Sequence, residues 1–219
     1  MSSPHIVVCG ADKGGVGKTT IARALVDYYQ SHGISLRAFD TEYPVGVLQR
    51  FHPTKTTIVN MDDTDDQMKI FDGLNQAQVT LIDIRAGLLS KTLFNLNMLG
   101  FFDGVRDGSL RISVVHVIGS NKASFDEIEV TAAAVQGAKH HILLNHTNRS
   151  KFEGLPTTVK DPIEVPLLDE KAASTVDLAG VGFSAFYADH GNSLTLRGYV
   201  NAWLKPVWRE FDRKALNAL

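Results

Sequence analysis

The residues with the clearest chemical purpose lie near the start of the chain, in the stretch GADKGGVGKTT from Gly10 to Thr20. A short apolar run, Ile6–Cys9, precedes this stretch, and apolar residues at helical spacing follow it. A glycine-rich turn between a strand and a helix lets backbone N–H groups converge on anionic oxygens, and the helix adds the positive end of its dipole. This context predicts a phosphate-binding loop.

Each residue type in this loop has an expected part in binding a nucleotide. The Lys18 ammonium is expected to reach the terminal phosphates, and the Thr19 hydroxyl is expected to ligate Mg²⁺. The glycines let the backbone curl around the phosphate oxygens. The expected nucleotide-binding residues of the loop are Lys13, Gly14, Gly15, Val16, Gly17, Lys18, Thr19 and Thr20.

Acidic side chains follow two later strand-like runs. Asp40 and Glu42 come after the second run, and Asp83 comes after Val79–Ile82. Ligands of open parallel sheets collect at the carboxyl ends of the strands, so these acids are expected to converge on the phosphate loop. Asp83 is expected to hold Mg²⁺ through water, and Gly87 to allow a loop that responds to the terminal phosphate. A solvated loop carboxylate is the alternative for Asp83 and Glu42.

The sequence also bears on the base of the nucleotide. The segment Asn121–Ser124 reads Asn-Lys-Ala-Ser and lacks the aspartate of a guanine-binding Asn-Lys-x-Asp motif. Adenine is therefore favoured by default. Asn145, at the end of a late strand-like run, is a candidate to contact the base edge, and a turn asparagine is the alternative.

The whole chain, residues 1–219, is expected to form one α/β domain. Strand-length apolar runs alternate with helical patterns, which predicts a mostly parallel twisted sheet with helices on both faces. The expected strands are Ile6–Cys9, Ile34–Phe39, Thr57–Met61, Val79–Ile82, Ile112–Ile118, His141–Leu144 and Ile163–Val165. Helices are expected over Leu88–Phe102 and Phe125–Val135, among others.

Composition excludes several other classes of protein. The chain is 44% hydrophobic and 21% charged with a net charge of −2, which is ordinary for a globular protein. Its one cysteine, Cys9, allows neither an internal disulfide nor a cluster held by several thiolates. The N-terminus lacks the pattern of a signal peptide, and no segment reaches the ~20 apolar residues of a membrane span. We therefore expect a cytoplasmic protein.

Several motifs together resemble the ParA/MinD family of ATPases. Lys13–Thr20 resembles the deviant Walker A motif of that family, Asp40–Glu42 its first switch and Asp83–Gly87 its second. Asn145 followed by Pro166 resembles its base-binding segment. The resemblance implies a P-loop nucleotide hydrolase of the SIMIBI type, a three-layer sandwich.

The resemblance also implies an activity. A member of this family would bind ATP with Mg²⁺, hydrolyse it slowly and form a homodimer around the nucleotide. Glu42 stands where the family usually has an aspartate that orients the attacking water, so the rate is in question. The residues implied in catalysis are Lys13, Lys18, Asp40 and Glu42, and those implied in Mg²⁺ binding are Thr19, Asp40 and Asp83.

The second lysine of the loop, Lys13, needs its own explanation. Lys18 already supplies the charge that one phosphate loop requires, and a second ammonium beside it would have to be desolvated at a cost. Lys13 is expected to reach the phosphates bound by a second subunit and to add charge there, as an arginine finger does. Phosphate binding within its own subunit, or plain solvent exposure, is the alternative.

Two functions fit these observations. The first is a nucleotide-controlled dimerisation switch that binds ATP and releases its dimer with ADP, acting in partition, positioning or conjugal transfer with an unidentified protein partner. The second is an ATP-dependent carboxylate-activating synthetase, of the cobyrinic acid or dethiobiotin synthetase type, on the same fold. Lys13 favours the switch, because those synthetases usually carry an uncharged residue at that position.

The C-terminal part bears on other partners. Val200, Leu204, Val207 and Phe211 form an apolar stripe that we expect to pack on the domain itself, with the helix interrupted at Pro206. Membrane binding through this stripe is therefore not expected. Basic residues after Gly191 leave nonspecific DNA binding open, although the sequence pI is about 6.4. The acidic run 62–66 is expected to begin a helix rather than to bind a cation.

Overall fold

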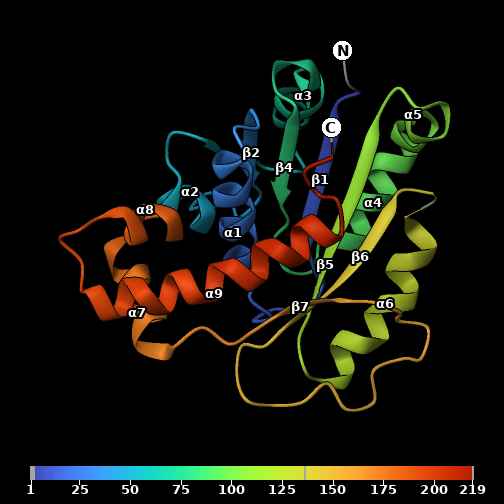
Figure 1. Cartoon of the computed structure of the whole chain (residues 1–219). Helices are drawn as coiled ribbons and strands as arrows, with labels where there is room; N and C mark the ends of the chain where they lie inside the picture. The colour runs from blue at the N-terminus through green and yellow to red at the C-terminus, as the bar shows by residue number, and fades with distance from the viewer. Residues whose placement is uncertain (1–2, 136, 219) are drawn as a thin grey trace.

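The computed structural model describes residues 3–135 and 137–218, and its centre is a seven-stranded parallel sheet (Figure 1). The strand order across the sheet is β3-β2-β4-β1-β5-β6-β7, and each neighbouring pair runs parallel. The strands are β1 His5–Gly10, β2 Leu36–Asp40, β3 Thr56–Ile58, β4 Val79–Asp83, β5 Arg111–Ile118, β6 Lys139–Asn145 and β7 Ile163–Val165. The α/β class expected from the sequence is confirmed.

The central strand β1 is buried on both faces. Val7 and Cys9 belong to the hydrophobic cluster on one face of the sheet, and Ile6 and Val8 belong to a second cluster on the opposite face. Side chains alternate across a strand, so an unbroken apolar run supplies both faces of a sheet that helices cover on each side.

One face of the sheet carries α1 (Lys18–Ser31), α7 (Glu170–Ala179), α8 (Phe183–Ala188) and α9 (Leu194–Arg213). Helix α9, red in Figure 1, crosses the front of the molecule, and the stripe residues expected to pack on the domain are buried there. The expected interruption at Pro206 is wrong, because α9 continues through this residue. A proline removes one backbone hydrogen bond, and the burial of the apolar stripe outweighs that loss here.

The other face carries α3 (Thr64–Phe71), the short 3-10 helix η1 (Leu74–Gln76), α4 (Leu89–Met98) and α5 (Phe101–Asp107). The single helix expected over Leu88–Phe102 is therefore two helices. Gly100 separates them with a φ of 79°, a left-handed conformation that a glycine adopts without strain.

The acidic run at the start of α3 acts as a helix N-terminus, as expected. The Asp63 side chain accepts a hydrogen bond from Asp66 N at 3.0 Å, and Asp66 in turn accepts from Asn60 N at 2.7 Å. The first contact satisfies a backbone donor that the helix start leaves unpaired, and the second ties the preceding turn to the helix.

Helix α6 (Lys122–Ala134) covers the end of the sheet near β6. It begins three residues before the expected Phe125, because the Asn121 side chain caps it by accepting from Ser124 N at 3.0 Å.

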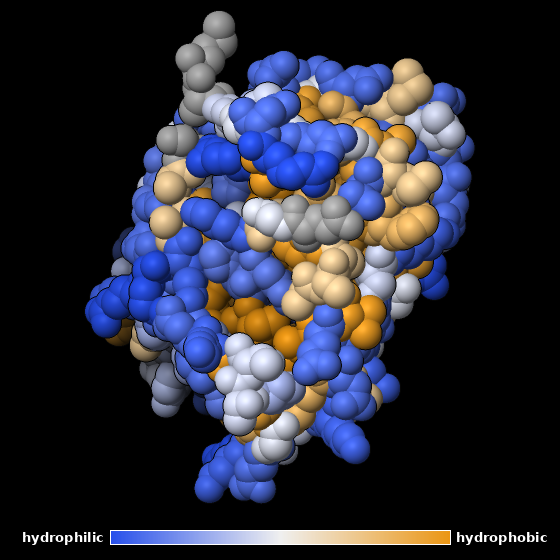
Figure 2. Space-filling view, turned by 90° about the vertical axis from the view of Figure 1, so that its right-hand side faces the viewer, coloured by the Kyte–Doolittle hydropathy of each residue, from blue (hydrophilic) through white to orange (hydrophobic). Residues whose placement is uncertain are grey.

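On the side of the molecule seen in Figure 2, the surface is mostly hydrophilic around a hollow with a hydrophobic floor. Within the described residues, no helix is both long enough and apolar enough to cross a membrane.

Candidate nucleotide-binding site

The glycine-rich loop connects the end of β1 to the start of α1, as its sequence context requires. Gly15 and Gly17 adopt positive φ angles of 75° and 85°, which turn the backbone toward the helix. Gly17 stands at the N-cap of α1, where it has no side chain to accept from the N–H groups of the first turn. These donors and the positive end of the helix dipole are therefore available to an anion.

Asn145 contacts the backbone of this loop. Its Nδ2 donates to Val16 O at 2.8 Å, and the residue is only 5% exposed. A Cβ on Gly17 would collide with the same nitrogen, so the loop favours glycine here for a steric as well as a conformational reason. The described contact of Asn145 is thus with the loop backbone, and its role in contacting a base stays a prediction.

A cavity of about 380 Å³ opens beside the loop at the carboxyl ends of the strands. It brings together most of the residues that the sequence singled out. Its lining consists of Gly14, Gly15, Gly17, Lys18, Thr19, Thr20, Asp40, Glu42, Asp83, Ile84, Arg85 and Ala86.

The other predicted residues lie outside this lining. Val16 is buried behind the loop, and the Lys13 side chain is exposed. Pro166 is exposed just after β7, and its carbonyl accepts from Trp203 Nε1 at 2.7 Å. The Lys13 carbonyl accepts from Lys18 Nζ at 3.4 Å, so the main chain of Lys13, and not its ammonium, contacts the loop lysine.

Two acids from neighbouring strands face each other in this cavity. Asp40 at the end of β2 pairs in register with Asp83 at the end of β4. The Asp40 carboxylate is 1% exposed and accepts three backbone hydrogen bonds, from Glu42 N at 2.9 Å, Leu48 N at 2.7 Å and Gln49 N at 3.2 Å. Asp40 therefore holds the segment that follows β2 and the start of α2 (Val47–Phe51).

Asp83 has a different environment. None of the described residues donates a hydrogen bond to its Oδ1, which is buried. Burial, followed by the charge of Asp40, raises the pKa of Asp83 to about 8, while the Thr19 hydroxyl and the Lys18 ammonium act in the opposite direction. A buried carboxylate oxygen that no donor reaches destabilises the ionised group unless a cation or a proton neutralises it. Asp83 and the Thr19 hydroxyl therefore fit a divalent cation placed beside the loop.

Thr41, between Asp40 and Glu42, is a functional candidate that was not among the residues predicted for the site. Its Oγ1 donates to Asp83 O at 3.1 Å and accepts from Arg85 N at 2.8 Å, and its backbone N also donates to Asp83 O. The residue is buried. It joins the segment that follows β2 directly to the segment that follows β4.

Comparison with known proteins identifies the fold. The septum site-determining protein MinD of Pyrococcus horikoshii, solved with Mg-ADP, superposes with a TM-score of 0.58 at 17% identity over 98% of each chain. The MinD cell division protein of Aquifex aeolicus gives 0.52 at 13% identity, over 96% of this chain and 97% of that chain. A ParA family ATPase of Chlorobium tepidum TLS gives 0.52 at 13% identity, over 93% of this chain and 99% of that chain.

No protein-family model matches the chain, and no curated protein matches it. The likeness to MinD and ParA structures is therefore a likeness of fold. It confirms the expected P-loop α/β architecture.

Proposed function

We propose that this chain binds ATP with Mg²⁺, hydrolyses it slowly and acts as a nucleotide-controlled dimerisation switch of the ParA/MinD kind. The observation that carries the proposal is the cavity beside the loop, where Lys18, the open N-terminus of α1 and the unpaired oxygen of Asp83 converge. This arrangement offers donors for phosphate and a carboxylate for a cation at one place. The superposition on a MinD structure solved with Mg-ADP supports it.

Mg²⁺, when bound, would neutralise part of the phosphate charge. Thr19 and Asp83 are the residues we assign to face it, Asp83 through water. Asp40 lines the same cavity, and its oxygens already accept three backbone bonds, so we place it farther from the cation than Asp83. Glu42, which is exposed at the rim, is our candidate to orient the attacking water.

The exposed ammonium of Lys13 fits a role in a second subunit. Two copies related by a two-fold axis would each place Lys13 against the phosphates held by the other copy, so ATP would join the subunits and ADP would release them. The unidentified protein partner and any DNA would then respond to the dimer.

Calorimetry tests the nucleotide site first. Wild-type protein should bind ATP with Mg²⁺, and Lys18→Ala should weaken or abolish that binding, because it removes the charge that reaches the phosphates. Equal ATP affinity in the two proteins would contradict the proposal.

Light scattering on Glu42→Gln, which should bind ATP without turnover, tests the switch. Glu42→Gln should form a dimer with saturating ATP, and the double variant that also carries Lys13→Ala should stay a monomer. A monomer in Glu42→Gln alone would contradict the switch.

A further inference from the structure

Asp12, the residue directly before Lys13, forms an unusual set of contacts for a loop residue. Its Oδ1 accepts from Ser90 N at 3.3 Å, and its Oδ2 accepts from Ser90 Oγ. Ser90 lies in the first turn of α4, shortly after Gly87 closes the second switch. The Asp12 side chain therefore connects the phosphate loop to the helix that the second switch leads into.

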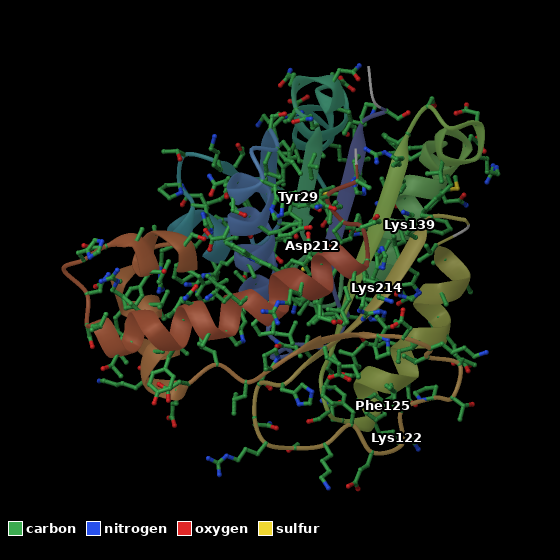
Figure 3. The ribbon with its side chains drawn as sticks, viewed as in Figure 1. Tyr29, Lys122, Phe125, Lys139, Asp212 and Lys214 are labelled. Atoms are coloured by element: carbon green, nitrogen blue, oxygen red, sulfur yellow. The ribbon has the colours of Figure 1, made fainter. Side chains whose placement is uncertain are left out.

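The backbone of the same residue is tied to another helix. Asp12 N donates to Glu127 Oε2 of α6 at 3.0 Å, and the Glu127 side chain is only 16% exposed. The imidazole Nε2 of the fully buried His116 lies 3.7 Å from this oxygen. In Figure 3 the first turn of α6, marked by Lys122 and Phe125, lies at the end of the molecule where β5 ends. Asp12 is thus fixed from α4 and from α6 at once.

The residues that follow Asp12 have far less support. Lys13, Gly14 and Gly15 are exposed, and a Cβ on Gly15 would meet no described atom within 4 Å. Glycines also leave the backbone free to adopt other conformations. The direction in which the chain enters Lys13 is therefore set mainly from the Asp12 side.

We propose that Asp12 is a positioning residue for Lys13, and that its link to Ser90 couples the phosphate loop to the second switch. The inference rests on the proposed function, in which Lys13 acts on the nucleotide of a partner copy. Asp12 itself does not line the nucleotide cavity. Its loss should therefore affect the step that needs Lys13 more than the binding of ADP, for which Lys18, Thr19 and the loop amides serve.

Steady-state kinetics and calorimetry separate these effects. Asp12→Ala should lower kcat for ATP by about tenfold to a hundredfold, the range expected for losing charge-assisted hydrogen bonds, with the Kd for ADP changed by no more than about twofold. Asp12→Asn keeps an acceptor for Ser90 and should recover part of kcat. Asp126→Ala, which removes an exposed acid next to Glu127, is the matched control and should leave both values unchanged.

A double-mutant cycle tests the link itself. Adding Ser90→Ala to Asp12→Ala should cause little further loss of kcat, because both changes remove the same contact. An unchanged kcat in Asp12→Ala, equal losses of kcat and ADP affinity, or fully additive effects with Ser90→Ala would each overturn the inference.

Hydrogen exchange on nucleotide-free protein distinguishes this inference from the proposed function. Asp12→Ala should speed amide exchange in the first turn of α4 and in the loop at residues 12–15, and Asp126→Ala should not. That pattern in a protein without ATP turnover would support the link and contradict the proposed function. Unchanged exchange in Asp12→Ala would overturn the link, whatever the activity.

Discussion

Strands β2 and β4 end in the same residue type at the same height in the sheet, yet the two carboxylates differ in their hydrogen bonds. Asp40 and Asp83 are partners in the β2–β4 register. Asp40 accepts three backbone hydrogen bonds, whereas Asp83 Oδ1 has no donor among the described residues. The first acid organises protein, and the second is available to a cation.

The path of the chain after each strand explains the difference. After β2 the chain turns back, so that the first N–H groups of α2 point at Asp40. Gly46 allows this approach, because a Cβ there would lie 2.5 Å from Asp40 Oδ2. After β4 the N–H groups of the next residues go elsewhere: Ile84 N donates to Cys9 O at 2.8 Å and Arg85 N to Thr41 Oγ1. The position of an acid at a strand end therefore predicts that it lines the cavity, and the path of the following backbone determines which hydrogen bonds its carboxylate accepts.

Helix α2, which follows Asp40 along the chain, is also anchored at its far end. The Arg23 guanidinium lies between the rings of Phe51 and Phe183, 3.4 Å and 4.3 Å from their centroids. Arg50 bonds to Asp177 of α7 at 2.9 Å. Helix α2 is thus held by Asp40 at its start and by the α7–α8 region at its end.

The largest difference between the two acids should appear in folding stability. Asp40→Ala leaves the buried N–H of Leu48 and the part-buried N–H of Gln49 without an acceptor, and should lower the free energy of unfolding by about 2–4 kcal/mol. Asp83→Ala removes a buried carboxylate whose Oδ1 has no donor among the described residues, and should cost far less. Urea unfolding without Mg²⁺ measures both values. Equal losses in the two variants would mean that the two carboxylates do not differ as described.

The pH dependence of the free energy of unfolding should distinguish Asp83 from Asp40 further. Burial raises the pKa of Asp83 from 3.8 to about 8, so between these values the folded state holds a proton that the unfolded state has released. The free energy of unfolding must therefore fall as pH rises through this window. Asp83→Asn lacks this titration, so its stability relative to wild type should increase from pH 4 to pH 8, by on the order of 1–3 kcal/mol.

Unfolding of both proteins in metal-free buffer across this pH range measures the difference, because the other titrating groups are common to both. A difference that stays constant with pH would contradict the environment described for Asp83. Saturating Mg²⁺ with ADP should reduce the pH dependence in wild type, since a bound cation favours the ionised carboxylate.

The smallest effect concerns the ion pair between Arg50 and Asp177 at the end of helix α2. Arg50 and Asp177 are both about half exposed, so Arg50→Ala should lower the free energy of unfolding by no more than about 1 kcal/mol. Arg106→Ala, which breaks another exposed ion pair with Asp103, is the matched control. Faster amide exchange in α2 of Arg50→Ala alone would confirm the anchor, and equal exchange in the two variants would argue against it.

Much of the site could be predicted from the sequence, because local order determines it. A glycine-rich loop after an apolar strand, and acids after two later strands, converge in any open parallel sheet. The break at Gly100 also had a signal, a glycine within a helical pattern. Contacts between distant segments could not be predicted. Asn145 bonds to Val16 across 129 residues and Asp12 to Ser90 across 78, and no local pattern encodes either pairing.

The division of work between the two acids is most directly tested by the effect of Mg²⁺ on ADP affinity. Calorimetric titrations with and without Mg²⁺ should be made on wild type, Asp40→Asn and Asp83→Asn, after circular dichroism has confirmed that each is folded. Mg²⁺ should strengthen ADP binding in wild type and in Asp40→Asn, and should have little effect in Asp83→Asn. Loss of the Mg²⁺ effect in Asp40→Asn with its retention in Asp83→Asn would contradict the account.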